Sequence, residues 1–148
     1  MNVANTITDI TNLIIDETRR ANNPLTTKDF AVIHQAAGNV PRPLPNGKMA
    51  VYSFFYIVND ECLKVGQANV KSKARYQSHH YHITGPSTLT RSLIADSKMP
   101  MVDNNTWPDW VKNNCERFDV LIDATFGKIT LNFIEGLLQY YFKPRYEG

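Results

Sequence analysis

Runs of apolar residues in this chain fall into short, strand-like segments and longer segments with helical spacing. Aromatic and β-branched residues fill 51–58, and a second short run covers 62–66 after a polar turn. These two runs predict a β-hairpin. A third run at 118–123 predicts another strand. We therefore expect a small antiparallel sheet of three strands.

Helical spacing predicts the elements around this sheet. Ile7, Ile10 and Ile14 form a stripe behind a capping pair that begins at Thr6, which predicts a helix to about Arg20. A second helix is expected from Thr26 or Thr27 to Ala37, and a third over the segment in which Lys71, Arg75 and His79 lie four residues apart on one face. Further helices are expected after Ser87, after Thr106, and from Ile129 to Phe142. The sequence thus predicts an α+β fold.

Three prolines in the segment 41–45 predict an extended connector between two parts of the chain. We expect residues 1–48 to form an N-terminal helical extension with this connector, and residues 49–148 to form the domain that contains the sheet. A homodimer contact or a partner subunit could use the N-terminal helices.

Length and composition exclude several classes of protein. The 148 residues suit one domain with a core of its own, and no apolar run is long enough to span a bilayer. The N-terminus lacks the features of a signal peptide. Cys62 and Cys115 do not have the spacing of a zinc site or a disulfide framework. A reduced, cytoplasmic location with no membrane partner is therefore expected.

Positive charge concentrates in the middle of the chain, although the net charge is only +2. Between residues 64 and 98 there is a single acid, Asp96. The basic residues in this stretch are Lys64, Lys71, Lys73, Arg75, Arg91 and Lys98. Such a cluster could be an ordinary solvated surface, but phosphate binding would also require it. Lys71, Lys73 and Arg91 are the candidate nucleic-acid contacts.

The hairpin and the segment after it resemble the GIY-YIG nucleases. Ala50-Val51-Tyr52 stands where that family has Gly-Ile-Tyr, and Lys64-Val65-Gly66 stands where it has Tyr-Ile-Gly. Some restriction-type members also carry lysine at the second tyrosine position. An arginine, a histidine and a glutamate in a late helix follow in the family's order. The late asparagine of the family is absent, and Glu147 lies near its place. The resemblance covers about 49–148.

This resemblance implies a nuclease-like fold and a metal-dependent DNA endonuclease, active in restriction, phage defence or DNA processing. Mg²⁺ (or Mn²⁺) would be the cofactor and Glu135 its ligand. Arg75 would bind the phosphate, while Lys64 or Tyr52 would take the proton from water. Lys64 can do so only if its pKa is lowered. His79 or His80 would orient the base, and the sequence leaves both open.

Each of these residues has a simpler structural explanation. Tyr52 alone reads as a core aromatic residue, Lys64 and Arg75 as surface charges, and Glu135 as a helix-forming residue at the border of an apolar stripe. The alternative function is a catalytically inactive nucleic-acid-binding or protein-interaction module on the same fold. RNA also stays open as a substrate.

Overall fold

The fold of this chain is described by a computed structural model for residues 1–77, 88–99 and 106–146. The elements in chain order are α1 (Val3–Arg20), β1 (Phe30–Gln35), β2 (Lys48–Tyr56), β3 (Glu61–Ala68), α2 (Lys73–Gln77), α3 (Thr88–Ala95), α4 (Trp107–Asn114), β4 (Cys115–Asp123), the short 3₁₀ helix η1 (Ala124–Phe126) and α5 (Gly127–Phe142). The α+β class is confirmed.

The four strands form one antiparallel sheet in the order β1-β4-β2-β3. The hairpin of β2 and β3 is confirmed, and β4 begins at Cys115, earlier than the predicted strand. The expectation of three strands was wrong, because β1 adds a fourth beside β4.

Strand β1 replaces a helix that the sequence predicted from Thr26 or Thr27 to Ala37. Phe30 pairs with Ile122 and Gln35 with Arg117 of β4, so the strand forms against a segment far away in the chain. Val32 and Ile33 are β-branched and favour a strand locally. The pairing with β4 selects the strand, so the second helix expected in the N-terminal helical extension was wrong, whereas its first helix is present as α1.

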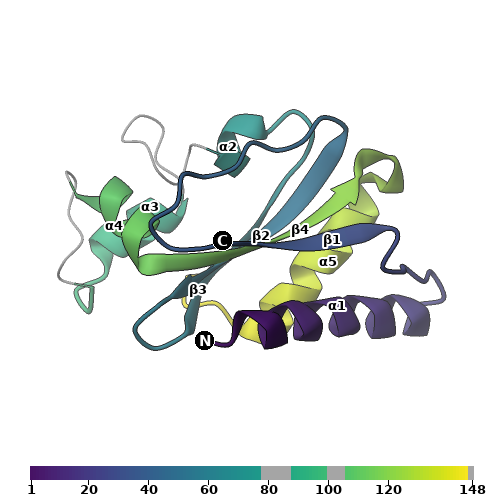
Figure 1. Ribbon diagram of the computed structural model, residues 1–148, viewed down its shortest axis with the longest axis horizontal. Helices are drawn as coiled ribbons and strands as arrows, with labels where there is room; N and C mark the ends of the chain where they lie inside the picture. Colours follow the sequence, from purple (N-terminus) through teal and green to yellow (C-terminus); the bar gives the residue numbers. More distant parts are fainter. Residues whose placement is uncertain (78–87, 100–105, 147–148) are drawn as a thin grey trace.

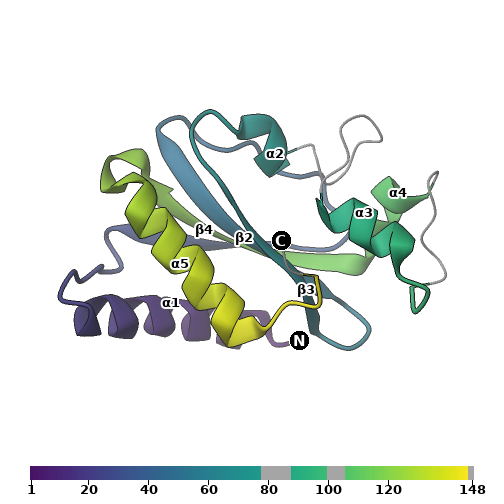
Figure 2. The same cartoon turned by 180° about the vertical axis from the view of Figure 1, so that it is seen from behind.

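Helices cover both faces of the sheet (Figures 1 and 2). On one face, which we call the α1–α5 face, Ile10, Ile14 and Ile134 pack against Val51 and Val120 of the strands. The opposite, α2–α4 face buries the helix residues Tyr76, Leu93 and Val111 together with Leu44 of the proline-rich connector. The strand residues in these two clusters are thus shielded from water, and a polar side chain among them needs a partner.

Two details of the helices differ from the sequence prediction. Helix α1 begins at Val3, and its cap is Asn2, whose side chain accepts a hydrogen bond from the backbone N–H of Asn5, so the predicted cap at Thr6 was wrong. The apolar stripe of the last helix, which contains Ile134, Leu137, Leu138 and Tyr141, predicts that Tyr141 is buried. In α5 this tyrosine is 49% exposed, whereas Leu131, Ile134 and Leu138 are buried.

The C-terminal tail covers part of the outer edge of β3. The backbone N–H groups of Arg145 and Tyr146 donate to the carbonyl oxygens of Cys62 and Leu63, at 2.9 and 3.0 Å. The guanidinium of Arg145 also bonds Asp96 after α3, at 2.8 Å. The tail therefore continues the hydrogen bonding of the sheet at an edge that would otherwise be open. Among the described residues, no helix has the length and apolar character needed to cross a membrane.

Candidate functional site

Two neighbouring rows of side chains cross the α2–α4 face of the sheet, because directly paired residues point to the same side. Read from β1 to β3, one row consists of Ile33, Asp119, Tyr52 and Gly66. The other row consists of Gln35, Arg117, Phe54 and Lys64. Tyr52 and Lys64 lie on adjacent strands in adjacent rows. The register therefore brings these two predicted site residues to the same part of one face as diagonal neighbours.

Tyr52 is held against the backbone of Gly66. A Cβ atom at Gly66 would lie 2.7 Å from the Cε2, Cζ and Oη atoms of Tyr52, closer than real side-chain carbons approach. The glycine of the Lys-Val-Gly segment thus leaves the space that the Tyr52 ring occupies. The tyrosine is 4% exposed, and its ring meets the ring of Phe54 edge-on at a centroid distance of 5.9 Å.

Lys64 is a buried lysine on an edge strand, with 4% of its surface exposed. Burial lowers the pKa of its ammonium below the ordinary 10.5, while attraction to the Glu135 carboxylate acts in the opposite direction. Lysine is among the residues least often buried, so its position here costs stability that a surface lysine would not. The lowered pKa is the condition under which Lys64 can accept a proton.

Glu135 lies in α5, on the α1–α5 face, and reaches β3 from that side. One carboxylate oxygen accepts a hydrogen bond from the amide of Gln67, and the other accepts from Gln139 at 3.3 Å. The Gln67 amide also donates to Asn132 at 2.8 Å. Glu135 is half-buried in a group of amide side chains, which the sequence did not predict.

The side chains around Glu135 include oxygen atoms of a type that Mg²⁺ binds, but the amide nitrogens of Gln67 and Gln139 face the carboxylate in this structure. One carboxylate and amide oxygens are the ligand types that this ion accepts, and it retains several waters. Softer ligands are absent from this group. Within the described ranges, no three His, Cys, Asp or Glu side chains are placed to bind one metal ion together. Any such ion would thus depend on Glu135, with Gln67 or Asn132 as supporting oxygen donors.

The remaining predicted residues are only partly placed. The backbone of Arg75 lies in α2, and the neighbouring Tyr76 packs on the α2–α4 face, opposite to α5. The side chain of Arg75, and His79 and His80 entirely, lie outside the described residues. Tyr52 and Lys64 thus lie on one face of the sheet beside the edge strand β3, and Glu135 lies on the other face beside the same strand. The described site residues therefore do not form one cluster on one face.

The basic residues Lys71, Lys73 and Arg91 are exposed and belong to segments beside or over the α2–α4 face. Lys71 lies in the loop before α2 and Arg91 in α3. The ammonium of Lys73 donates to the side-chain oxygen of Asn46 at 2.6 Å, which joins α2 to the connector. This placement gives the α2–α4 side of the molecule several positive charges.

A buried ion pair between Arg117 and Asp119 was missed by sequence reasoning. The Nε atom of Arg117 donates to Asp119 at 2.7 Å, and the two side chains are 1% and 0% exposed. The same carboxylate accepts from the Tyr76 hydroxyl at 2.7 Å and from the Gln35 amide. The sequence does show two charged residues at alternate positions of an apolar strand. This pattern normally indicates a strand with one face exposed to water, so it does not predict a buried ion pair.

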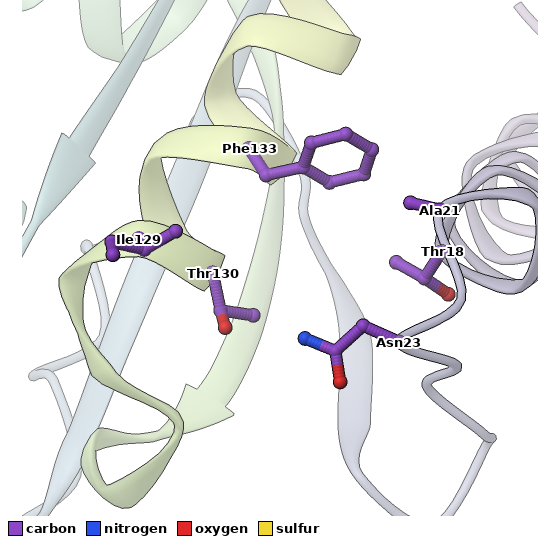
Figure 3. A pocket seen from close by; sticks show the side chains of 6 residues that line it. All are labelled: Thr18, Ala21, Asn23, Ile129, Thr130 and Phe133. Atoms are coloured by element: carbon purple, nitrogen blue, oxygen red, sulfur yellow. The ribbon is translucent and has the colours of Figure 1, made fainter.

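Two other features carry no chemistry for the site. Burial raises the pKa values of the Cys62 and Cys115 thiols to about 12, so neither forms a reactive thiolate near neutral pH. A cavity of about 200 Å³ lies between the end of α1 and the start of α5, where Phe133 points toward Ala21 (Figure 3). Its lining contains no ionisable side chain.

Comparisons with known proteins returned no match. No family model, no curated protein and no solved structure matches this chain.

Proposed function

We propose that this protein is a divalent-metal-dependent DNA endonuclease of the GIY-YIG type. The main support is Lys64, a nearly fully buried lysine with a lowered pKa that lies diagonally beside Tyr52 and within the electrostatic reach of Glu135. A buried ionisable group with a shifted pKa is more frequent at functional sites than elsewhere. Its position in Lys-Val-Gly is also where the resembling nucleases carry their catalytic residue.

In this proposal Lys64 in its neutral form accepts the proton of the attacking water. Tyr52, held in place by Gly66, positions that water through its hydroxyl group. Arg75 binds two oxygens of the scissile phosphate, since a guanidinium matches them in pairs. Lys71, Lys73 and Arg91 attract the DNA backbone and hold it over the α2–α4 side.

Glu135 would hold the metal ion, with Gln67 or Asn132 turning an amide oxygen toward it. When bound, the ion supplies charge stabilisation for the phosphate and for the leaving oxygen. The present hydrogen bond between Gln67 and Glu135 keeps the carboxylate beside β3. The proposed site therefore extends round the edge of this strand.

Cleavage of plasmid DNA, single-stranded DNA and single-stranded RNA, with Mg²⁺ or with EDTA, tests the proposal. Glu135→Gln should abolish cleavage and leave the thermal unfolding transition in place. The matched control is Glu17→Gln in α1. The Glu17 carboxylate forms an ion pair with Arg20 at 3.2 Å and takes no part in the proposed site, so this variant should cut like wild type. Lys64→Met should lower the rate by about 10²–10⁴-fold, the usual contribution of a positioned base. Equal cutting by wild type and Glu135→Gln would refute the metal role.

A non-catalytic DNA-binding module is the second candidate. It is favoured by the position of Glu135 on the face opposite to Tyr52, and by the amide donors that occupy both of its carboxylate oxygens. Salt-dependent DNA binding without cutting, unchanged in Glu135→Gln, would support this candidate and overturn the enzyme.

A further inference from the structure

The ion pair of Arg117 and Asp119 connects parts of the chain that are distant in sequence. Its guanidinium carbon lies 5.2 Å from the ring centroid of Tyr52 in β2 and 4.4 Å from that of Tyr76 in α2. The Asp119 carboxylate accepts from the Tyr76 hydroxyl and from Gln35 of β1. One buried pair on β4 therefore contacts β1, β2 and α2.

The contacts continue into the connector before β2. The side-chain oxygen of Gln35 accepts a hydrogen bond from the backbone N–H of Arg42 at 2.8 Å. Lys73 of α2 bonds Asn46 of the same connector at 2.6 Å. The connector is thus fixed at both ends, once through the buried pair and once through α2.

A purely apolar core would stabilise the sheet without this pair. Burying an ion pair of this kind is often no better for stability than well-packed apolar residues, so its presence is weak evidence for a stabilising role. What the pair adds is a fixed orientation of the groups that it contacts. A planar guanidinium between aromatic rings and a carboxylate with three donors fix the orientation of each partner.

We infer that Arg117 and Asp119 are positioning residues that hold the Tyr52 ring, helix α2 and the connector in one fixed arrangement. Tyr52 and the segment that carries Arg75 would keep their relative places only while this pair is intact. Gln35 and the connector, which both lie within the first 48 residues, then help to hold the site together, because they belong to the same network. The catalytic consequence rests on the proposed function, but the geometric one does not.

The test compares Arg117→Met with a matched control, Arg145→Met. Arg145 is also an arginine paired with an aspartate and lies over a ring, at 5.9 Å from Tyr146, but it belongs to the tail. Arg117→Lys is the conservative variant, and Tyr76→Phe is a milder one that removes only the hydroxyl bonded to Asp119. Hydrogen exchange is measured for peptides from α2, the connector and α1, and cleavage is measured as kcat and KM.

We expect Arg117→Met to speed exchange in α2 and the connector but not in α1, and to lower kcat by about 100-fold, as small displacements of reacting groups do. KM should stay near that of wild type, and Arg117→Lys should recover part of kcat because it keeps the charge. Arg145→Met should change neither kcat nor exchange in α2. Equal effects of Arg117→Met and Arg145→Met, or exchange that rises uniformly, would overturn the inference.

The outcome stays readable if parts of the experiment fail. Should Arg117→Met not fold, Tyr76→Phe carries the same comparison, and exchange in α2 equal to that of wild type would overturn the inference. Should wild type cut no nucleic acid, the proposed function fails, but the exchange measurements still decide whether the pair positions α2 and the connector.

Discussion

Replacing Gly66 with alanine tests how the hairpin holds Tyr52. The new methyl group would lie 2.7 Å from three atoms of the Tyr52 side chain. The ring has little room to move, since it is 4% exposed and the Arg117 guanidinium lies 5.2 Å from its centroid. Overpacking of this kind costs about 1–3 kcal/mol. Removing glycine from a strand recovers about 0.5–1 kcal/mol. The two ranges leave a net loss for Gly66→Ala of about 0–2.5 kcal/mol, and their midpoints give about 1–1.5 kcal/mol, which is the expected value.

Urea unfolding followed by circular dichroism measures this loss as a lower midpoint at an unchanged slope. For a chain of this size the melting temperature should fall by about 3–6 °C. Gly136→Ala is the matched control. A methyl group at Gly136, in α5, would meet no atom within 4 Å, and the change should stabilise the helix by up to about 1 kcal/mol.

A double-mutant cycle identifies the cause. In a Tyr52→Ala background the clash disappears, so Gly66→Ala should cost nothing or should stabilise slightly. The coupling between the two positions should then be at least about 1 kcal/mol, as for residues in direct contact. The reasoning is refuted if Gly66→Ala is as stable as wild type, or if it costs the same free energy in both backgrounds.

Three further predictions concern charged groups. Burial lowers the pKa of Lys64 below 10.5 in the folded state. Between this lowered pKa and 10.5 the unfolded state binds more protons than the folded state, so stability rises with pH. Thermal melts should therefore show wild type gaining stability relative to Lys64→Met as the pH rises through this window. Hydrogen bonds from Tyr146, the backbone of Lys98 and Arg145 lower the pKa of Asp96 to about 2. The advantage of wild type over Asp96→Asn should thus be complete above about pH 4 and disappear in acid melts as the pH falls to about 2. Lys73→Ala and Arg91→Ala should each reduce the slope of log Kd for DNA against log salt by about 1, whereas Lys128→Ala at the start of α5 should not, as measured by fluorescence anisotropy.

The sequence predicted the elements whose signals are local. The hairpin follows from two runs of strand-forming residues and the turn between them, where Asp60 adopts a positive φ of 57°. Helix α4 follows from Thr106 and the proline after it, and α5 from its apolar stripe. In each case the residues that define the element lie next to one another, so spacing and turn chemistry are sufficient.

Strand β1 could not be read in the same way. Phe30, Ile33 and Ala37 suit one face of a helix, and the residues between them do not forbid it. The strand is stabilised by pairing with β4, which begins about eighty residues later in the chain, as the pairing of Gln35 with Arg117 shows. Local propensity is a weak guide where such a partner exists.

The same partner explains why the polar network was missed. Arg117 and Asp119 stand at alternate positions of β4, the pattern expected for a strand with one face in water. Here α2, α3, α4 and the connector cover that face, so the two charges are buried and must satisfy each other and their neighbours. Which side of a strand meets water depends on elements that no window around β4 contains. Arg117 and Asp119, which fix the arrangement around Tyr52, are therefore residues whose neighbours in the sequence do not indicate that they are buried.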